Sequence, residues 1–340
     1  MSAPAISVLV PAYRDERTLD AALASVAAQS ERDLEVVVSD DGSEDGGDNG
    51  SVDAMRAIAR GWAECDPRVR LLDDSTHLGM TANWNRALAA ARGEWVAKLD
   101  ADDVWEPETL ARLRAPFASE PDLAAAFCRA VECDEALAPV APWHGEPAFA
   151  AAGLDVATDS VRSGWIFHAM SFDDRQLWHS NAFLVRRAEL ERLGGWDERW
   201  SCASDTDLIL RLLESDRPVA HVAYVGVRYR RRAGSVSDRA GREGWKTLES
   251  VLVALAALDR VGVAAVEDSE PLRQSWWRLW RALAAMRGDE ELWRRVPEES
   301  RAALRRFAEE VPPPPLAIRV AGDLRLGAWK LKRALAGKRT

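Results

Sequence analysis

The chain has 340 residues, which is enough for one large α/β domain and an appended piece. Hydrophobic residues make up 47% of it and charged residues 29%, as is usual for a globular protein in water. The formal net charge of −10 argues against nucleic acid as a partner of the molecule as a whole.

Cysteine use and hydropathy bear on where the protein works. The four cysteines have no zinc-like spacing, and the opening segment MSAPAISVLV lacks the pattern of a secretory signal peptide. We therefore expect reduced thiols in a cytoplasmic protein. No apolar run approaches the roughly 20 residues of a membrane span, so any membrane contact would be peripheral, at the inner face.

Strand and helix patterns alternate through the first hundred residues. Short apolar runs predict strands at 6–10, 34–38, 68–72 and 94–100. Amphipathic stretches between them predict helices near 19–26, 52–63 and 81–92. This alternation predicts a Rossmann-like, mostly parallel sheet covered by helices. Acidic or polar turns follow three of the strands, at the edge where open α/β sheets bind ligands.

The next part of the chain is less regular. The pattern predicts a helix at 107–120 and a strand at 123–128, then long loops with short elements over 134–180. That irregular segment could line an acceptor site, and we expect its histidines to be packed or exposed rather than ligands. A strand and helix follow, then a helix capped by Ser204 and two short strands at 219–222 and 224–230.

The C-terminal third is predicted to be helical. We expect a first domain over 1–240, a helical extension over 241–311, and a third segment over 312–340. In the third segment PPPP is a stiff break before a basic amphipathic helix at 316–339. Such a helix can bind an anionic membrane surface or pack on protein, and we favour packing.

Two acidic clusters carry the strongest chemical signal. In KLDADDVWEP, the carboxylates of Asp100, Asp102 and Asp103 follow directly after an apolar run. An Asp-x-Asp turn at a strand end suits Mg²⁺ or Mn²⁺, although solvated acids are also common in turns. In VVVSDDGSED, Asp40 and Asp41 could accept hydrogen bonds from a base and a ribose, or simply begin a turn.

The order of motifs resembles glycosyltransferase family 2, whose members are inverting enzymes with the GT-A fold. The likeness runs from Ile6 to about Ser237 and rests on VPAYRDE, VVVSDDGSED, HLGMTANWNRAL, GEWVAKLDADD, GGWDERW, SDTDLILRLL and YRRRAGSVS. It implies an EC 2.4 transferase of the hexosyl or N-acetylhexosaminyl type. The donor would be a nucleoside-diphosphate sugar, most commonly UDP-linked. The acceptor class stays open between a glycan, a lipid-linked molecule, a protein and a small molecule.

The resemblance also assigns roles to residues. It implies that Asp102 binds Mn²⁺ or Mg²⁺ and that Asp205 is the general base that takes the acceptor proton. Asp207 is the alternative base, and Trp196 either faces the acceptor or anchors a buried loop. The residues expected at the nucleotide or donor are Pro11, Ala12, Tyr13, Asp40, Asp41, Asp100, Asp103, Arg230 and Arg232.

Three positions depart from the family pattern. Ser204 stands where a Glu usually precedes the base, and His77 stands where Asn is common. Arg232 replaces a His that can touch metal or phosphate. Since Arg cannot ligate a cation but can clamp phosphate oxygens, we expect fewer protein ligands on the metal, with Arg232 or Arg230 on the diphosphate.

Two other readings remain. A nucleotidyltransferase also joins an α/β sheet to paired acids, but VPAYRDERT lacks the glycines of a triphosphate-binding loop. A catalytically degenerate member of the same fold, acting as a nucleotide-sugar-binding or scaffold protein, is kept open by Ser204 and Arg232. Donor turnover would eliminate this second reading.

Overall fold

The computed structural model describes residues 3–42, 50–72, 77–171, 176–215, 217–262 and 289–295, with a few isolated positions beyond them. These residues divide into two compact units, one within 1–235 and the other within 236–340. The predicted boundary at 240 falls inside helix α10 (Val236–Glu243), and the boundary at 311–312 stays a prediction.

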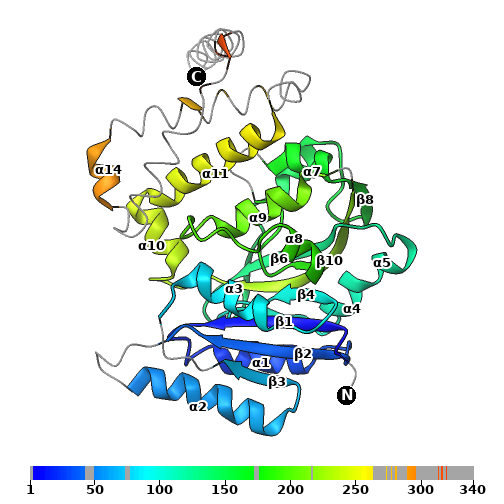
Figure 1. The fold of residues 1–340 in the computed structure, drawn as a ribbon, viewed down its shortest axis with the longest axis vertical. Helices are drawn as coiled ribbons and strands as arrows, with labels where there is room; N and C mark the ends of the chain where they lie inside the picture. The colour runs from blue at the N-terminus through cyan, green and yellow to red at the C-terminus, as the bar shows by residue number, and fades with distance from the viewer. Residues whose placement is uncertain are drawn as a thin grey trace. The chain divides into compact units, whose positions relative to one another are not determined.

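The first unit is built on one mixed sheet (Figure 1). In the described residues it has ten strands in the order β3-β2-β1-β4-β9-β6-β10-β5, with β7 beside β6 and β8 beside β10. The strands that form its path are β1 (Ile6–Ala12), β2 (Leu34–Asp40), β3 (Val69–Leu72), β4 (Trp95–Lys98), β5 (Val104–Trp105), β6 (Ala125–Cys133), β9 (Phe183–Arg186) and β10 (Pro218–Arg230). Strands β3, β2, β1 and β4 are parallel, and β9 is antiparallel to both its neighbours. The predicted α/β class with a largely parallel sheet is confirmed.

The first strands are buried because helices cover both faces of the sheet. Every residue of β1 and β2 is buried, as is typical of strands with two covered faces. Val8 and Val10 belong to one core, with α1 (Leu19–Ala27) and α2 (Gly50–Cys65). Leu9 points the other way, into a core that contains residues of α3 (Met80–Ala90). The alternation follows from the two-residue period of a strand.

Two predicted elements have different bounds. The helix expected at 107–120 is two short helices, α4 (Thr109–Arg114) and α5 (Pro116–Ser119), because Pro116 has no N–H to continue the first. The two short strands expected at 219–230 are a single strand, β10, whose register against β6 shifts after Val222 and again after Val225. Such irregularities let a strand absorb an extra residue without ending.

Short elements fill the middle of the chain. The irregular stretch over 134–180 contains short helices and strands, as predicted, and α8 and α9 follow β9. Helix α9 begins at Ser204 with Ala203 as its N-cap, so the expected Ser204 cap is wrong. The Ser204 hydroxyl is instead bonded to Thr81 Oγ1 at 3.2 Å. The elements are β7 (Pro139–Pro142), α6 (Pro147–Ala151), β8 (Ser160–Ser163), α7 (Gly164–Ser171), α8 (Arg187–Arg192) and α9 (Ser204–Leu213).

The second unit is helical where it is described. Helix α11 (Trp245–Val261) lies between Gly244 and Gly262, which both have a positive φ. Helices α10 and α14 (Glu290–Arg295) pack against it. The predicted basic helix at 316–339 falls outside the described residues apart from single positions. None of the described helices is both long and apolar enough to cross a membrane.

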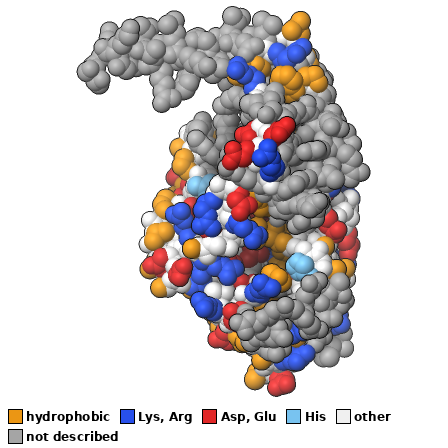
Figure 2. Space-filling view, turned by 90° about the vertical axis from the view of Figure 1, so that its left-hand side faces the viewer, with side chains coloured by type: hydrophobic (Ala, Val, Ile, Leu, Met, Phe, Trp, Pro, Cys, Tyr) orange, Lys and Arg blue, Asp and Glu red, His pale blue; other side chains and the backbone are white. Residues whose placement is uncertain are grey.

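Acidic and basic side chains are intermingled on the face of the molecule shown in Figure 2. Ion pairs between them recur through the described residues, several of them with one partner almost fully buried. Buried pairs matter more to the architecture than exposed ones, because a buried charge left without its partner is costly.

Candidate active site

The predicted site residues follow the carboxyl ends of neighbouring strands. Strands β1 and β2 end side by side at Ala12 and Asp40, and β4 ends one strand away at Lys98. The acidic turn at 100–103 therefore lies at the same edge of the sheet as the first two loops. This is the edge where open α/β sheets bind ligands. Pro11 and Ala12 are both buried at the end of β1.

Asp40 has one carboxylate oxygen without a hydrogen-bond donor among the described residues. The side chain is fully buried, and its Oδ2 accepts a hydrogen bond from Arg56 Nε of α2 at 2.5 Å. Arg86 of α3 also donates to its backbone carbonyl. Oδ1 is buried and accepts no hydrogen bond from the described part of the chain. Because an unsatisfied buried acceptor is unfavourable, this oxygen would gain from an N–H donor.

Asp41 fixes the loop that leads into α3. Its Oδ1 accepts hydrogen bonds from the amides of Leu78 and Gly79 at 2.8 and 3.2 Å, and Oδ2 lies 3.3 Å from His77 Nδ1. Burial raises the pKa of Asp41, and the two amide bonds and His77 oppose that rise. The rings of His77 and Tyr13 lie 5.0 Å apart, and both are more than a third exposed.

Lys98 is a fully buried cation at the end of β4. Its Nζ lies 2.5 Å from Asp100 Oδ1 and 3.0 Å from Asn181 Oδ1, and it stands 4.2 Å above the ring of Trp84. Burial alone would raise the pKa of Asp100, but the charge and hydrogen bond of Lys98 outweigh it and the pKa is lowered. Asp100 is therefore held as a carboxylate.

Asp103 joins three separate segments of the chain. Its Oδ1 accepts a hydrogen bond from the Arg230 amide at 2.8 Å, and Oδ2 accepts one from Asn181 Nδ2 at 2.6 Å. His179 Nε2 lies 3.9 Å from the same Oδ2. Burial, then the charges of its two acidic neighbours, raise the pKa of Asp103 well above its ordinary value. These contacts give Asp103 a structural role beside any donor contact.

Asp102 faces a guanidinium group. Arg232 Nε lies 2.8 Å from Asp102 Oδ2, and Arg232 Nη2 donates to Asp15 Oδ1 at 2.8 Å. Asp15 is held in turn by the amide of Tyr13, at 3.0 Å from Oδ2. Burial raises the pKa of Asp102 to about 6, although Arg232 opposes the rise. Arg230 Nε donates to the Asp102 carbonyl at 2.8 Å, so both arginines are bound to the acidic turn.

The acidic turn, where the sequence predicts a metal at Asp102, is bonded to cationic and amide groups of the protein. Among the described residues no group of three or more His, Cys, Asp or Glu side chains could hold a metal ion. Of the three turn acids, Asp102 faces Arg232, Asp100 faces Lys98, and Asp103 is bonded to Arg230 and Asn181. A divalent ion needs oxygen ligands that are free to turn toward it, and these carboxylates are already bound. As arranged, they do not fit Mn²⁺ or Mg²⁺.

The two candidate bases differ in their surroundings. Asp205 lies in the first turn of α9, partly exposed, with Oδ2 accepting a hydrogen bond from Gln176 at 3.1 Å. Asp207 is 2% exposed and paired with Arg211 at 2.8 Å. Arg211 also donates to the carbonyl of Gly195, so Asp207 helps to fix the glycine turn before α9. Of the two carboxylates, Asp205 is therefore the more accessible.

Trp196 is an anchor in this structure. Its side chain is 1% exposed and meets Trp84 edge-on at 5.7 Å, so of the two alternatives the structure favours the buried loop anchor.

Sequence reasoning left out Asp15, Lys98, His179 and Asn181. Lys98 could have been found from the sequence, because it ends an apolar strand and a buried ammonium needs a partner.

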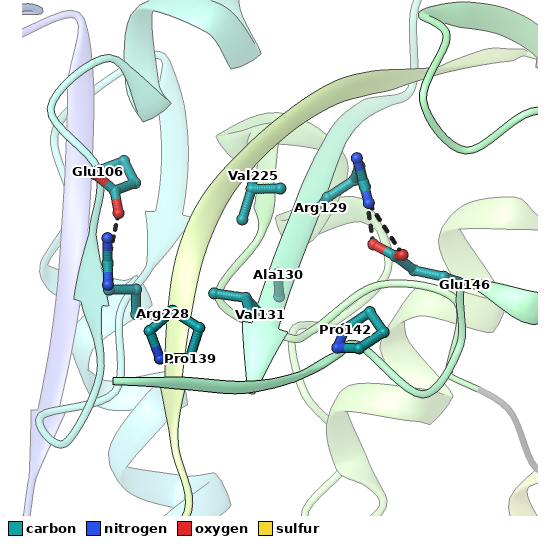
Figure 3. Close-up of a pocket in the computed structure, with 9 residues that line it drawn as sticks. All are labelled: Glu106, Arg129, Ala130, Val131, Pro139, Pro142, Glu146, Val225 and Arg228. Carbon is teal, nitrogen blue, oxygen red and sulfur yellow. Dashed lines mark hydrogen bonds and ion pairs between the residues drawn. The ribbon is translucent and has the colours of Figure 1, made fainter. Parts of the chain in front are cut away.

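A separate pocket of about 360 Å³ lies among β6, β7 and β10 (Figure 3). Its floor is apolar, and two ion pairs flank it, Arg129–Glu146 at 2.8 Å and Arg228–Glu106 at 2.6 Å. In both pairs the arginine and the glutamate neutralise each other. None of the predicted site residues lines the pocket.

Comparison with known sequences gives a consistent family. Residues 7–174 match Glycosyl transferase family 2. The uncharacterized protein y4gI of Sinorhizobium fredii is 30% identical over 69% of this chain, which covers 23% of that protein. The O-antigen biosynthesis protein RfbC of Myxococcus xanthus is 28% identical over 72% of this chain and 17% of its own. The chain thus spans only about a fifth of the length of these two relatives.

Solved structures share the fold. TarS of S. aureus (residues 1–349) in complex with UDP-GlcNAc has a TM-score of 0.60 at 18% identity, over 91% of this chain and 82% of that one. The mannosyltransferase PcManGT from Pyrobaculum calidifontis, in complex with GDP-Man and Mn²⁺, has a TM-score of 0.51 at 18% identity, over 96% and 87%. Both are GT-A glycosyltransferases. From its motifs, its GT-A fold and the match over residues 7–174, the chain belongs to glycosyl transferase family 2.

Proposed function

We propose that this protein is an inverting glycosyltransferase that moves a sugar from a nucleoside-diphosphate sugar to a hydroxyl acceptor. UDP is the carrier that we favour. One observation carries the proposal: Asp40, with a buried oxygen that has no donor among the described residues, lies at the same edge of the sheet as the charged acidic turn. The structural neighbours in complex with UDP-GlcNAc and with GDP-Man support a nucleotide-sugar donor.

The nucleobase would lie beside the ends of β1 and β2. Asp40 Oδ1 would accept a base N–H, a hydrogen bond that no donor among the described residues supplies to this buried oxygen. The partly exposed rings of Tyr13 and His77 offer a surface on which a flat base can stack. Pro11 and Ala12 bring the backbone of β1 to the same place.

Transfer would take place between the acidic turn and α9. The acceptor oxygen attacks the anomeric carbon, the bond from that carbon to the diphosphate oxygen breaks, and its electron pair leaves with the diphosphate. Asp205 takes the proton of the acceptor hydroxyl. Gln176 holds Asp205 Oδ2, whereas the Ser204 hydroxyl is bonded to Thr81 and not to this carboxylate.

The resemblance implies a divalent metal that would offset the charge of the diphosphate. Because the carboxylates as arranged do not fit such an ion, the proposed transfer uses only groups of the chain itself. The acceptor class stays open between glycan, lipid-linked molecule, protein and small molecule. A cytoplasmic location, with or without membrane contact through 316–339, is part of the proposal, and that segment lies outside the described residues apart from single positions.

The proposal is tested by calorimetric titration of UDP, TDP and GDP into the purified full-length chain, followed by a hydrolysis screen of the matching sugars. We expect one nucleotide to bind and one of its sugars to be turned over. In Asp40→Ala, both that nucleotide and its nucleoside should bind about 10-fold to 100-fold more weakly, because the lost contact is to the base.

The matched control is Glu64→Ala, which removes one exposed acid from α2, the helix that carries Arg56, without touching Asp40. Its affinity should equal that of the unmodified protein. Folded protein that binds none of the nucleotides would overturn the proposed function. Tight binding without turnover of any sugar would favour the degenerate binding protein.

A further inference from the structure

We propose that the guanidinium of Arg232 is a built-in counter-cation for the donor diphosphate, in the place where relatives would recruit a divalent metal, so that donor binding does not depend on a metal ion. The proposal rests on the function proposed above. The carboxylate of Asp102, where a metal is expected, faces this guanidinium instead.

The contacts of Arg232 fix its head group between two acids. Nε lies 2.8 Å from Asp102 Oδ2, and Nη2 donates to Asp15 Oδ1 at 2.8 Å. Asp15 is 8% exposed and is held by the Tyr13 amide, so this side of the clamp is anchored to the end of β1. On the other side, Asp102 is anchored through its carbonyl, which accepts a hydrogen bond from Arg230.

Arg232 keeps donors for a further ligand. A guanidinium carries five N–H donors, and the contacts to the two acids involve only Nε and Nη2. The side chain is 34% exposed, and among the described residues the structure gives Nη1 no hydrogen bond, so Nη1 keeps its donors for a phosphate. Planar guanidinium groups match phosphate oxygens geometrically, and such charge-assisted bonds are stronger than neutral ones.

A divalent ion at Asp102 would compete with this arrangement. It would have to share the carboxylate with a guanidinium 2.8 Å away, and two positive groups so close repel strongly in a partly buried site. Displacing Arg232 would also leave Asp15 without its cation. Both costs are avoided if Arg232 stays in place and the diphosphate binds to its remaining N–H groups.

The transfer step needs no reactant besides the donor and the acceptor. When the glycosidic bond to the diphosphate breaks, the electron pair goes to the leaving oxygen, and Arg232 stabilises the added charge by electrostatic attraction and hydrogen bonding. Arg232 does not donate its proton, because a guanidinium stays protonated in proteins. The acceptor proton goes to Asp205, as proposed above.

The test compares UDP and uridine binding in EDTA, Mg²⁺ and Mn²⁺, by calorimetry on the full-length chain. If UDP is not the nucleotide that binds, the preferred diphosphate and its nucleoside replace this pair. We expect the UDP affinity in EDTA to lie within about 3-fold of that in Mn²⁺. In Arg232→Met, UDP should bind about 10-fold to 100-fold more weakly in EDTA, while uridine binds as before.

The control is Arg231→Met, which removes the same charge from an exposed neighbour paired with Glu132. It should leave UDP affinity within about 2-fold, because a screened surface charge contributes little. Unchanged uridine binding shows that the Arg232→Met site is folded. UDP binding that is lost in EDTA and restored at least 10-fold by Mn²⁺ would overturn the inference while leaving the proposed function intact. Equal losses in the two arginine variants would also overturn it.

Discussion

The ammonium of Lys98 lies 2.5 Å from Oδ1 of Asp100, although the lysine side chain itself has no exposed surface. A charge buried in this way is tolerated only with a partner, and Asp100 and Asn181 both supply acceptors. This pair ties the end of β4 to the acidic turn.

Lys98→Met should therefore destabilise the fold. Removing one partner of a buried pair leaves Asp100 uncompensated, and we expect the free energy of unfolding to fall by about 3 kcal/mol. Chemical denaturation measures it. The control Lys246→Met, at an exposed position, should change stability by less than about 0.5 kcal/mol. A loss in Lys98→Met no larger than in this control would show that the pair is not important to stability.

The two acids at the start of α9 should separate into different phenotypes. Asp205→Asn is expected to reduce the transfer rate about 100-fold to 10,000-fold with donor affinity and stability unchanged, because it removes a general base. Asp207→Asn should instead lower the free energy of unfolding by about 2–3 kcal/mol, since Arg211 loses a buried partner. Steady-state kinetics and denaturation are measured on both. Exchange of the two phenotypes would identify Asp207 as the base.

The glycine turn offers a matched pair of substitutions. Gly194 and Gly195 both have a positive φ, but a Cβ on Gly194 meets nothing within 4 Å, whereas one on Gly195 would lie 2.5 Å from Asn85 Oδ1. Gly194→Ala should cost about 1 kcal/mol of stability from backbone strain alone. Gly195→Ala should cost at least about 2 kcal/mol, because it also disturbs the hydrogen bonds between Asn85 and Trp196. Equal losses on thermal unfolding would contradict this.

The cysteines should differ sharply in reactivity. Burial raises the pKa of the Cys128 thiol to about 12, so at pH 8 only about one molecule in 10,000 carries the reactive thiolate there. Cys65 is exposed. Iodoacetamide treatment at pH 8, followed by mass spectrometry, should label Cys65 in native protein and leave Cys128 unmodified until the chain is denatured. Labelling of native Cys128 as fast as Cys65 would refute this.

The sequence was most informative where local order dictates geometry. Because parallel strands end at a common edge, the run of strands followed by acidic turns was sufficient to place Asp40 and the 100–103 turn together. It was not sufficient to pair Arg232 with Asp15, more than two hundred residues earlier in the chain. Motifs give residue types at intervals, but which cation neutralises which acid depends on the packed structure. The single strand β10 was missed for a related reason, since its shifts in register interrupt the apolar alternation without ending the pairing.

The alternation of side chains along β10 determines how a deletion in this strand would affect the site. Arg228, Arg230 and, just past the strand, Arg232 are separated by two residues each, and their guanidinium groups reach Glu106, the Asp102 carbonyl and the Asp102 carboxylate in turn. Strand geometry gives alternate residues a common face. Loss of a single residue in the irregular stretch near Val222–Val227 would withdraw these three guanidinium groups from that face together and bring Tyr229 and Arg231 to it instead. The charge at the site is therefore set by the spacing of a distant part of the sheet as well as by the residues that contact it.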